Sequence, residues 1–275
     1  MFMRCTISHS LGYQSLQMAS PVTSTLNETN FLTRTFRIVR LALLLVATVL
    51  VIYCVFPFCP DRMRLRLRSG LAAALLAALC VDIEADLTHV VPGALVVANH
   101  ISWLDILVIH AVLPSAFVSK EEVRHWPVIG GMAARTDTVF LRRGSRGHAR
   151  IVNQEIAGIL ATGKHVAVFP EGTTTDGQTL LHFHAALIQP ALAAGCPVLP
   201  VAISYWEPDG RRSLAPRYDG HISLGQCTWA ILGRKRLIAR LVTTPPCGLN
   251  GEDRRQVAAM AREAICAGAG LPRPE

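Results

Sequence analysis

The chain has 275 residues, of which 51% are hydrophobic and only 17% charged. This composition excludes a highly charged disordered protein and favours contact with a membrane. Lys and Arg outnumber Asp and Glu by 27 to 19, a formal net charge of +8, which suits anionic lipid headgroups, phosphorylated substrates or nucleic acid. The eight cysteines form no CxxC pair and no spacing typical of a zinc site, so we expect mostly buried, reduced thiols.

The N-terminal part of the chain divides into a polar tail and an apolar run. Residues 1–33 are rich in Ser, Thr, Asn and Gln and show no periodicity, which is typical of a flexible tail. The run LALLLVATVLVIYCVFPFCP, residues 41–60, contains no charge. As a helix it would be about 30 Å long, which matches one hydrocarbon core. We therefore expect a membrane anchor here.

The residues that flank this run bear on its orientation. Four arginines follow it and three precede it, so the positive-inside rule favours, by one charge, a cytoplasmic C-terminal side; they are Arg34, Arg37 and Arg40 before and Arg62, Arg64, Arg66 and Arg68 after. The next stretch, RLRLRSGLAAALLAALC, is too short to span, and it is either an interfacial helix or a core helix. We assign residues 34–80 to the anchor and interfacial helix.

From residue 81 onward, short β-rich runs alternate with helical stretches. This alternation predicts an α/β fold, with a mostly parallel sheet flanked by helices, over residues 81–275. We expect strands at VDIEAD, ALVVAN, AFVSK, TVFLR, HVAVFP, VLPVAIS, HISLG and LIARLVT, and helices at 103–112, 145–162, 183–195 and 251–267.

The polar segment NHISWLD, residues 99–105, directly follows the strand predicted at ALVVAN. Side chains at strand ends of open α/β sheets reach solvent while the sheet holds them rigidly. On one continuous helix, His100 and Asp105 would point about 140° apart, so their contact requires a turn before a helix that Ser102 could cap. Asp105 would then bind one imidazole nitrogen and leave the other free to accept a proton. No GxSxG elbow supplies a protein nucleophile, so this base would act on a substrate hydroxyl.

A second polar cluster, FPEGTTTDG at 169–177, follows the strand predicted at HVAVFP. Gly172 allows another backbone to approach closely, and Thr173 and Thr174 offer hydroxyls ahead of an Asp-Gly turn. Packing gives no reason for Glu171 at this strand end, which favours a functional role, with an ordinary glycine-rich turn as the alternative.

Four segments occur in the order and spacing of the motifs of the glycerolipid acyltransferase superfamily. They are NHISWLD, the KEEVRHWPVIGGMAARTDTVFLRRG region at 120–144, FPEGT at 169–173 and VLPVA at 198–202. Over roughly residues 80–245 the chain resembles most closely the bacterial 1-acylglycerol-3-phosphate acyltransferase type.

This resemblance implies O-acyl transfer from acyl-CoA or acyl carrier protein (acyl-ACP), which are co-substrates, with no resident cofactor and no metal. His100 would remove the proton of the acceptor hydroxyl, and Asp105 would orient the imidazole. Arg143, Glu171 and Gly172 are linked by the resemblance to binding of the acceptor, and we place Thr173 and Thr174 in the same site.

The acceptor is expected to be a lysolipid. The best match is 1-acylglycerol-3-phosphate, which would be converted to phosphatidic acid. Phosphatidic-acid-forming members, however, commonly carry Arg where this chain has Thr174. A Thr-Thr variant is familiar in relatives that acylate lyso-ornithine lipid or other lysolipids, and these are the alternative acceptors. We expect the enzyme in the bacterial inner membrane, with its catalytic domain on the cytoplasmic side.

Two other functions use the same residues. A metal-dependent hydrolase would combine His100 and Asp105 with His182 or His184, although these two histidines also fit a surface position. A non-catalytic membrane-bound lipid binder is the other possibility. A nucleic-acid binder is disfavoured because the arginine clusters lack interleaved aromatic residues and accompany a spanning segment.

Overall fold

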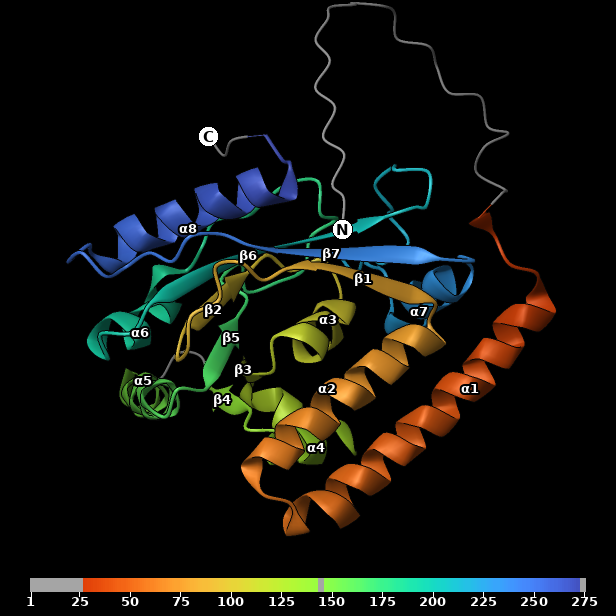
Figure 1. The fold of residues 1–275 in the computed structure, drawn as a ribbon, viewed down its shortest axis with the longest axis horizontal. Helices are drawn as coiled ribbons and strands as arrows, with labels where there is room; N and C mark the ends of the chain where they lie inside the picture. Colours follow the sequence, from red (N-terminus) through yellow and green to blue (C-terminus); the bar gives the residue numbers. More distant parts are fainter. Residues whose placement is uncertain (1–26, 143–145, 273–275) are drawn as a thin grey trace, which may run out of the picture.

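The computed structural model describes residues 27–142 and 146–272, with the backbone alone for 146–149. Within these ranges the strands form one sheet in the order β1-β7-β6-β2-β5-β3-β4 (Figure 1). Their bounds are β1 Val81–Asp86, β2 Leu95–Ala98, β3 Ser115–Lys120, β4 Val139–Leu141, β5 His165–Val168, β6 Val198–Trp206 and β7 Leu237–Thr243. All neighbouring strands pair in parallel except β6 and β7, which are antiparallel. The mostly parallel sheet expected from the sequence is confirmed.

Helices cover both faces of the sheet (Figure 1). One face carries α2 (Asp61–Ala78), α3 (Leu104–Val112) and α7 (Leu224–Leu232). The other face carries α5 (Arg146–Ala161), α6 (Gln189–Ala193) and α8 (Arg254–Ala269). The remaining short helices are η5 (Glu121–His125), α4 (Ile129–Arg135) and η6 (Ala185–Leu187).

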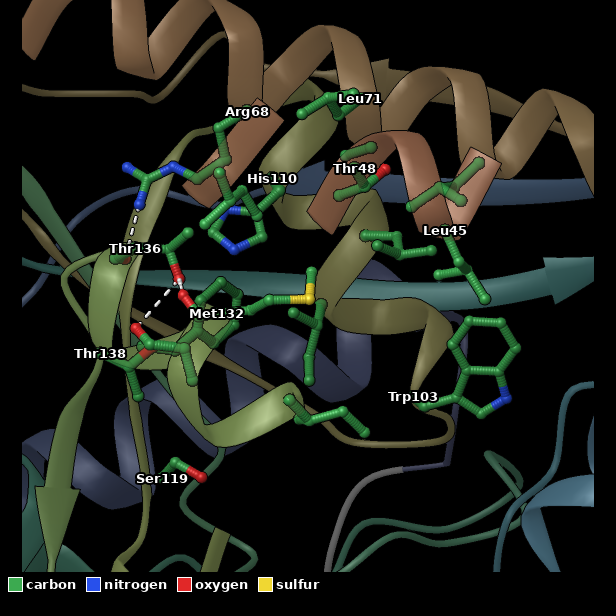
Figure 2. Close-up of a pocket in the computed structure, with 18 of the residues that line it drawn as sticks. Leu45, Thr48, Arg68, Leu71, Trp103, His110, Ser119, Met132, Thr136 and Thr138 are labelled. Carbon is green, nitrogen blue, oxygen red and sulfur yellow. Dashed lines mark hydrogen bonds between the residues drawn. The ribbon is translucent and has the colours of Figure 1, made fainter. Parts of the chain in front are cut away.

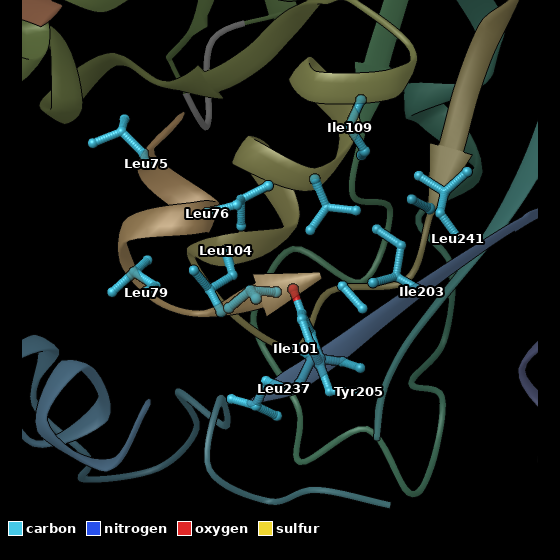
Figure 3. Packing of buried hydrophobic residues seen from close by; sticks show 14 of the residues in the cluster. Leu75, Leu76, Leu79, Ile101, Leu104, Ile109, Ile203, Tyr205, Leu237 and Leu241 are labelled. Carbon is cyan, nitrogen blue, oxygen red and sulfur yellow. The ribbon is translucent and has the colours of Figure 1, made fainter. Parts of the chain in front are cut away.

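The core on the α2–α3 side places the site residues. Leu76 of α2 and Leu79, its C-cap residue, pack with Leu104 of α3 and with Ile203 of β6 (Figure 3). All four side chains are fully or almost fully buried, and burial of one Leu or Ile side chain stabilises a fold by about 1.5–3 kcal/mol. The start of α3 is therefore held firmly against the centre of the sheet.

An N-terminal helical hairpin lies along the same side of the sheet (Figure 1). Its first arm is α1 (Phe31–Leu50), which continues through a π-helical turn (η3, Val51–Val55) and a 3-10 turn (η4, Phe56–Phe58), and its second arm is α2. Within the described part of the chain, the 28 residues of this first arm are the one candidate membrane span, judged by length and composition alone. The helix begins inside the predicted tail and ten residues before the uncharged run, because Asn30 caps it by accepting a hydrogen bond from the Thr33 amide at 2.9 Å.

Arginines of the hairpin bond to main-chain carbonyls of the protein. Arg37 is buried and donates to the carbonyl of Leu232, at the C-terminal end of α7, at 3.2 Å. Arg40 donates to the carbonyl of Ala77 in α2 at 2.7 Å. A cation is favourable at a helix C-terminus because the helix dipole places negative charge there. Arg37 therefore joins the hairpin to α7, and Arg40 joins the two arms of the hairpin. Because both charges have partners inside the protein, a charge count alone is a poor guide to orientation.

Two of the predicted strands and helices of the sheet domain differ from the structure. The strand predicted at HISLG is wrong, because Ser223 and Gln226 form a capping box that starts helix α7. The helix predicted at 183–195 is broken into η6 and α6, since Pro190 lacks the amide hydrogen that a continuous helix would use.

Candidate active site

The central strand β2 ends at Ala98 and delivers Asn99 and His100 to the carboxyl edge of the sheet. Asn99 is 1% exposed, and its side chain bonds to the neighbouring strand β6. Its Nδ2 donates to the main-chain carbonyl of Ile203 at 2.9 Å, and its Oδ1 accepts from the main-chain amide of Ile203 at 2.7 Å. These two bonds fix the position of His100 relative to the neighbouring strand.

His100 and Asp105 meet as the sequence predicts. The distance between His100 Nδ1 and Asp105 Oδ2 is 2.8 Å, and the same oxygen accepts bonds from the amides of Ile101 at 2.7 Å and Ser102 at 2.9 Å. Asp105 therefore both closes the turn before α3 and holds the imidazole in place. The expected cap by Ser102 is wrong, because α3 has Trp103 at its N-cap and no side-chain cap. The carboxylate of Asp105 instead accepts hydrogen bonds from the amides of Ile101 and Ser102.

Asp105 has a further partner that the sequence did not indicate. Tyr205 on β6 donates its hydroxyl to Asp105 Oδ1 at 2.7 Å. Burial, followed by the charge of Asp105, raises the pKa of Tyr205 well above its ordinary value, so the hydroxyl keeps its proton. Asp105 is fully buried, and donors on both oxygens stabilise its negative charge. A negative carboxylate holds the Nδ1–H tautomer of His100, which leaves Nε2 able to accept a proton.

Phe169 fixes the plane of the imidazole. Its ring stacks on His100 with centroids 3.9 Å apart and an interplanar angle of 10°. Phe169 follows β5, which pairs with β2, so the carboxyl ends of two adjacent parallel strands supply the base and its support. The side chain of His100 is 19% exposed, and a substrate can therefore reach it.

Glu171 joins the two loops by bonding to backbone amides. Its Oε1 accepts from the His100 amide at 2.8 Å, and its Oε2 accepts from the Leu181 amide at 2.9 Å. The side chain is 4% exposed, and burial raises the pKa of Glu171 while these two backbone bonds oppose the rise. The structure thus gives Glu171 a bracing contact, and its role in binding the acceptor stays a prediction.

The remaining predicted acceptor residues lie around the same loop. Gly172 has a φ of +70°, a left-handed conformation that favours glycine. Thr173 is exposed, and Thr174 donates its hydroxyl to the main-chain carbonyl of Tyr218. Arg143, the predicted phosphate ligand, lies outside the described residues. A role for these four residues in acceptor binding stays a prediction.

An apolar cavity of about 500 Å³ opens between the helical hairpin and the core of the domain (Figure 2). Its wall includes Leu41 and Leu45 of α1, Leu75 of α2, and one face of α3 that begins with Trp103. Phe117 also lines it and lies 6.0 Å from the Phe169 ring that stacks on His100. The catalytic pair and the cavity are therefore neighbours joined by aromatic contacts.

In the described part of the chain, the other histidines do not form a metal site with His100 and Asp105. Over residues 27–142 and 150–272, no group of three or more His, Cys, Asp or Glu is placed to hold a metal ion. The rings of His182 and His184 contact each other edge to face, 6.2 Å apart. The metal-dependent alternative therefore gains no support from the placement of these side chains.

Comparison with known proteins identifies the family. Residues 82–204 match the family described as Acyltransferase. The chain is 39% identical over 219 residues to the 1-acyl-sn-glycerol-3-phosphate acyltransferase of Neisseria meningitidis serogroup B, an alignment that covers 78% of this chain and 84% of that protein. The chain belongs to this acyltransferase family.

Another relative carries a different name. This chain is 38% identical over 203 residues to the lyso-ornithine lipid O-acyltransferase of Pseudomonas aeruginosa, an alignment that covers 74% of this chain and 78% of that protein. The crystal structure of the 1-acyl-sn-glycerophosphate (LPA) acyltransferase from Thermotoga maritima has the same fold, with a TM-score of 0.62 and 23% identity, over 86% of this chain and 96% of that one. The resemblance expected from the sequence motifs is confirmed.

Proposed function

We propose that this acyltransferase moves an acyl group from acyl-CoA or acyl-ACP to a lysolipid hydroxyl, with 1-acylglycerol-3-phosphate as the acceptor and phosphatidic acid as the product. The 2.8 Å contact between His100 and Asp105 beside an apolar cavity carries this proposal. A buried carboxylate, a held imidazole and adjacent apolar space are what transfer of a lipid acyl chain requires.

The reaction proceeds by direct attack of the acceptor. The acceptor oxygen forms a bond to the thioester carbonyl carbon while its proton moves to His100 Nε2. The bond from that carbon to sulfur then breaks, and the imidazolium returns the proton to the departing thiolate. Asp105 stabilises the imidazolium between these two proton transfers. Its three further donors, the amides of Ile101 and Ser102 and the hydroxyl of Tyr205, keep its carboxylate in place.

Lyso-ornithine lipid is the second candidate acceptor. The observation in its favour is Thr174, whose hydroxyl bonds to the Tyr218 carbonyl at the position where phosphatidic-acid-forming members commonly have Arg. Without that guanidinium, one bidentate phosphate contact is missing. The similarity to the Pseudomonas aeruginosa relative, 38% identity, supports the same candidate.

We also propose that the enzyme works on the bacterial inner membrane, with its catalytic domain on the cytoplasmic side. The support is the apolar first arm of the hairpin, Phe31–Phe58, which exposes large side chains such as Leu43 and Phe58. Exposed apolar surface of this kind is stabilised by contact with lipid.

The test uses full-length protein in vesicles, a labelled acyl thioester, and both acceptors in competition. The His100→Ala variant should lose transfer to both acceptors, while Asp105→Asn should lose on the order of 10³–10⁴-fold in rate. His89→Ala, which changes a histidine beyond the end of β1, is the matched control and should keep full activity. Retained transfer by His100→Ala would overturn the proposal, and normal complementation of an acyltransferase-deficient strain by that variant would indicate a lipid binder.

A further inference from the structure

One end of the apolar cavity is polar. The side chains of Arg68, His110, Thr136 and Thr138 line it on the side away from Leu45 and Trp103 (Figure 2). Arg68 comes from the hairpin, and its guanidinium donates to the Thr136 carbonyl at 2.6 Å. Ser119 of β3 also lines the cavity. An acyl chain needs only apolar walls, so polar groups at one end require another explanation.

Part of helix α3 separates the polar end of the cavity from the end next to His100. Trp103, Ile106, Leu107 and His110 all line the cavity, and their spacing of three, four and seven residues puts them on one face of α3. The seven residues from Trp103 to His110 correspond to about 10 Å along a helix axis. Trp103 belongs to the turn that holds His100, so His110 marks a point about two helical turns deeper in the cavity.

The polar groups at this end have unused hydrogen-bonding capacity. In the described part of the chain, His110 Nδ1 and Arg68 Nε are enclosed and have no partner. The half-buried side chains of Ser119 and Thr138 also line the cavity. Buried polar groups without partners are rare in folded proteins and cost stability, which points to a ligand that completes them.

The charges at this end favour a neutral ligand. The guanidinium of Arg68 lies 3.7 Å from the carboxylate of Asp137, so the cation already has a counter-charge. Burial, with a smaller contribution from the charge of Arg68, lowers the pKa of His110 to about 3. His110 is therefore a neutral imidazole, which has one N–H donor and one acceptor nitrogen. A hydroxyl group, which both donates and accepts, is the complementary partner.

We propose that the polar end of the cavity selects an acyl chain that carries a hydroxyl group, with His110 as its hydrogen-bonding partner. This inference rests on the proposed acyl transfer and adds the class of chain. The chain is either the acyl group of the thioester or the chain already on the lysolipid, since both are apolar chains that end near His100 in the reaction.

The experiment compares acyl thioesters of one chain length. One has no substituent, one carries a hydroxyl close to the thioester, and the others carry it at successive carbons of the outer half. A parallel set places the same hydroxyls on the chain of the lysolipid. The protein is the full chain in vesicles, and the measurement is kcat/KM for each substrate relative to the unsubstituted one.

We expect a preference of about fivefold to tenfold for a hydroxyl in the outer half, as expected from one neutral hydrogen bond, and none for a hydroxyl beside the thioester. The series that shows this preference identifies which chain enters the cavity. The His110→Phe variant should lose the preference, and His110→Asn should keep part of it. The same exchange at the exposed His221, which does not line the cavity, gives the control variant His221→Phe, and it should leave the preference unchanged.

Two outcomes would overturn the inference. They are equal use of substituted and unsubstituted chains in both series, and an unchanged preference in His110→Phe. Failure of the proposed acyl transfer is distinguishable, because the wild-type protein would then transfer no chain at all. If His110→Phe does not fold, two measurements still test the inference. They are the ratio of kcat/KM for hydroxylated and unsubstituted chains in His110→Asn, and the dependence of kcat/KM on the hydroxyl position in the wild type.

Discussion

Tyr205→Phe tests whether the hydroxyl on β6 controls the catalytic pair. The substitution removes one oxygen atom from a fully buried side chain and leaves its ring in the core beside Leu104 and Ile203. What is lost is the 2.7 Å hydrogen bond to Asp105 Oδ1. The other carboxylate oxygen keeps its three donors, so the variant isolates the contribution of Tyr205.

The magnitude follows from the burial of Asp105. Its side chain is 0% exposed, so water cannot replace the missing donor on Oδ1. A hydrogen bond to a charged group contributes about 1.5–3 kcal/mol, and we expect the free energy of unfolding to fall by that amount. Asp105 also orients the imidazole of His100, so kcat/KM for acyl transfer should fall in the same variant.

The assay combines denaturant unfolding in detergent micelles with kcat/KM of acyl transfer. Tyr53→Phe is the control, because it removes the hydroxyl of a partly exposed ring in the hairpin without touching Asp105. An unfolding free energy and a kcat/KM that both match those of the wild type would refute the role assigned to Tyr205.

Three further variants test the loop after β5. Thr174→Arg should raise the preference for 1-acylglycerol-3-phosphate over lyso-ornithine lipid by about tenfold, since a charge-assisted bond to phosphate is regained; an equal gain with Thr179→Arg, elsewhere on the loop, would contradict this. Gly177→Ala should unfold more readily than Gly210→Ala: both glycines have a positive φ, but only at 177 would a Cβ lie 2.7 Å from Ile101, and a difference below about 1 kcal/mol in unfolding free energy would count against it. Because burial raises the pKa of Glu171 above 4.5, its protonation stabilises the fold below pH 4.5, and that stabilisation is lost as the pH rises through the raised pKa. Glu171→Gln should lack this pH dependence, and unfolding curves across the acid range with the wild-type slope would disprove it.

The contact between His100 and Asp105 could be predicted because it is local. Five residues separate the two side chains, and helix geometry alone requires a turn between them. The contact of Tyr205 with Asp105 could not be predicted, because the register between β2 and β6 brings these residues together across 100 positions of the chain. No nearby pattern in the sequence marks that tyrosine.

Glu171 and α7 show a different limit. The sequence marked Glu171 as a residue that packing explains poorly, and its role in acceptor binding stays a prediction. Its two amide partners could not be predicted, because they lie on separate loops whose approach depends on the whole sheet. The α7 segment was predicted as a strand from HISLG, although Ser223 followed by Gln226 is a helix-start signal. The capping box outweighed a short alternation of apolar residues.

The N-terminal hairpin exposes apolar side chains on one side and forms a wall of the apolar cavity on the other. Leu41, Leu45, Thr48 and Ile52 of its first arm face the same space as Trp103, and Arg37 ties that arm to the end of α7. A shortened protein that starts at β1 would therefore open this apolar cavity to water. An unrelated apolar helix in place of the hairpin would not rebuild the wall, so a chimera between relatives should take the hairpin and the residues that face it from the same parent.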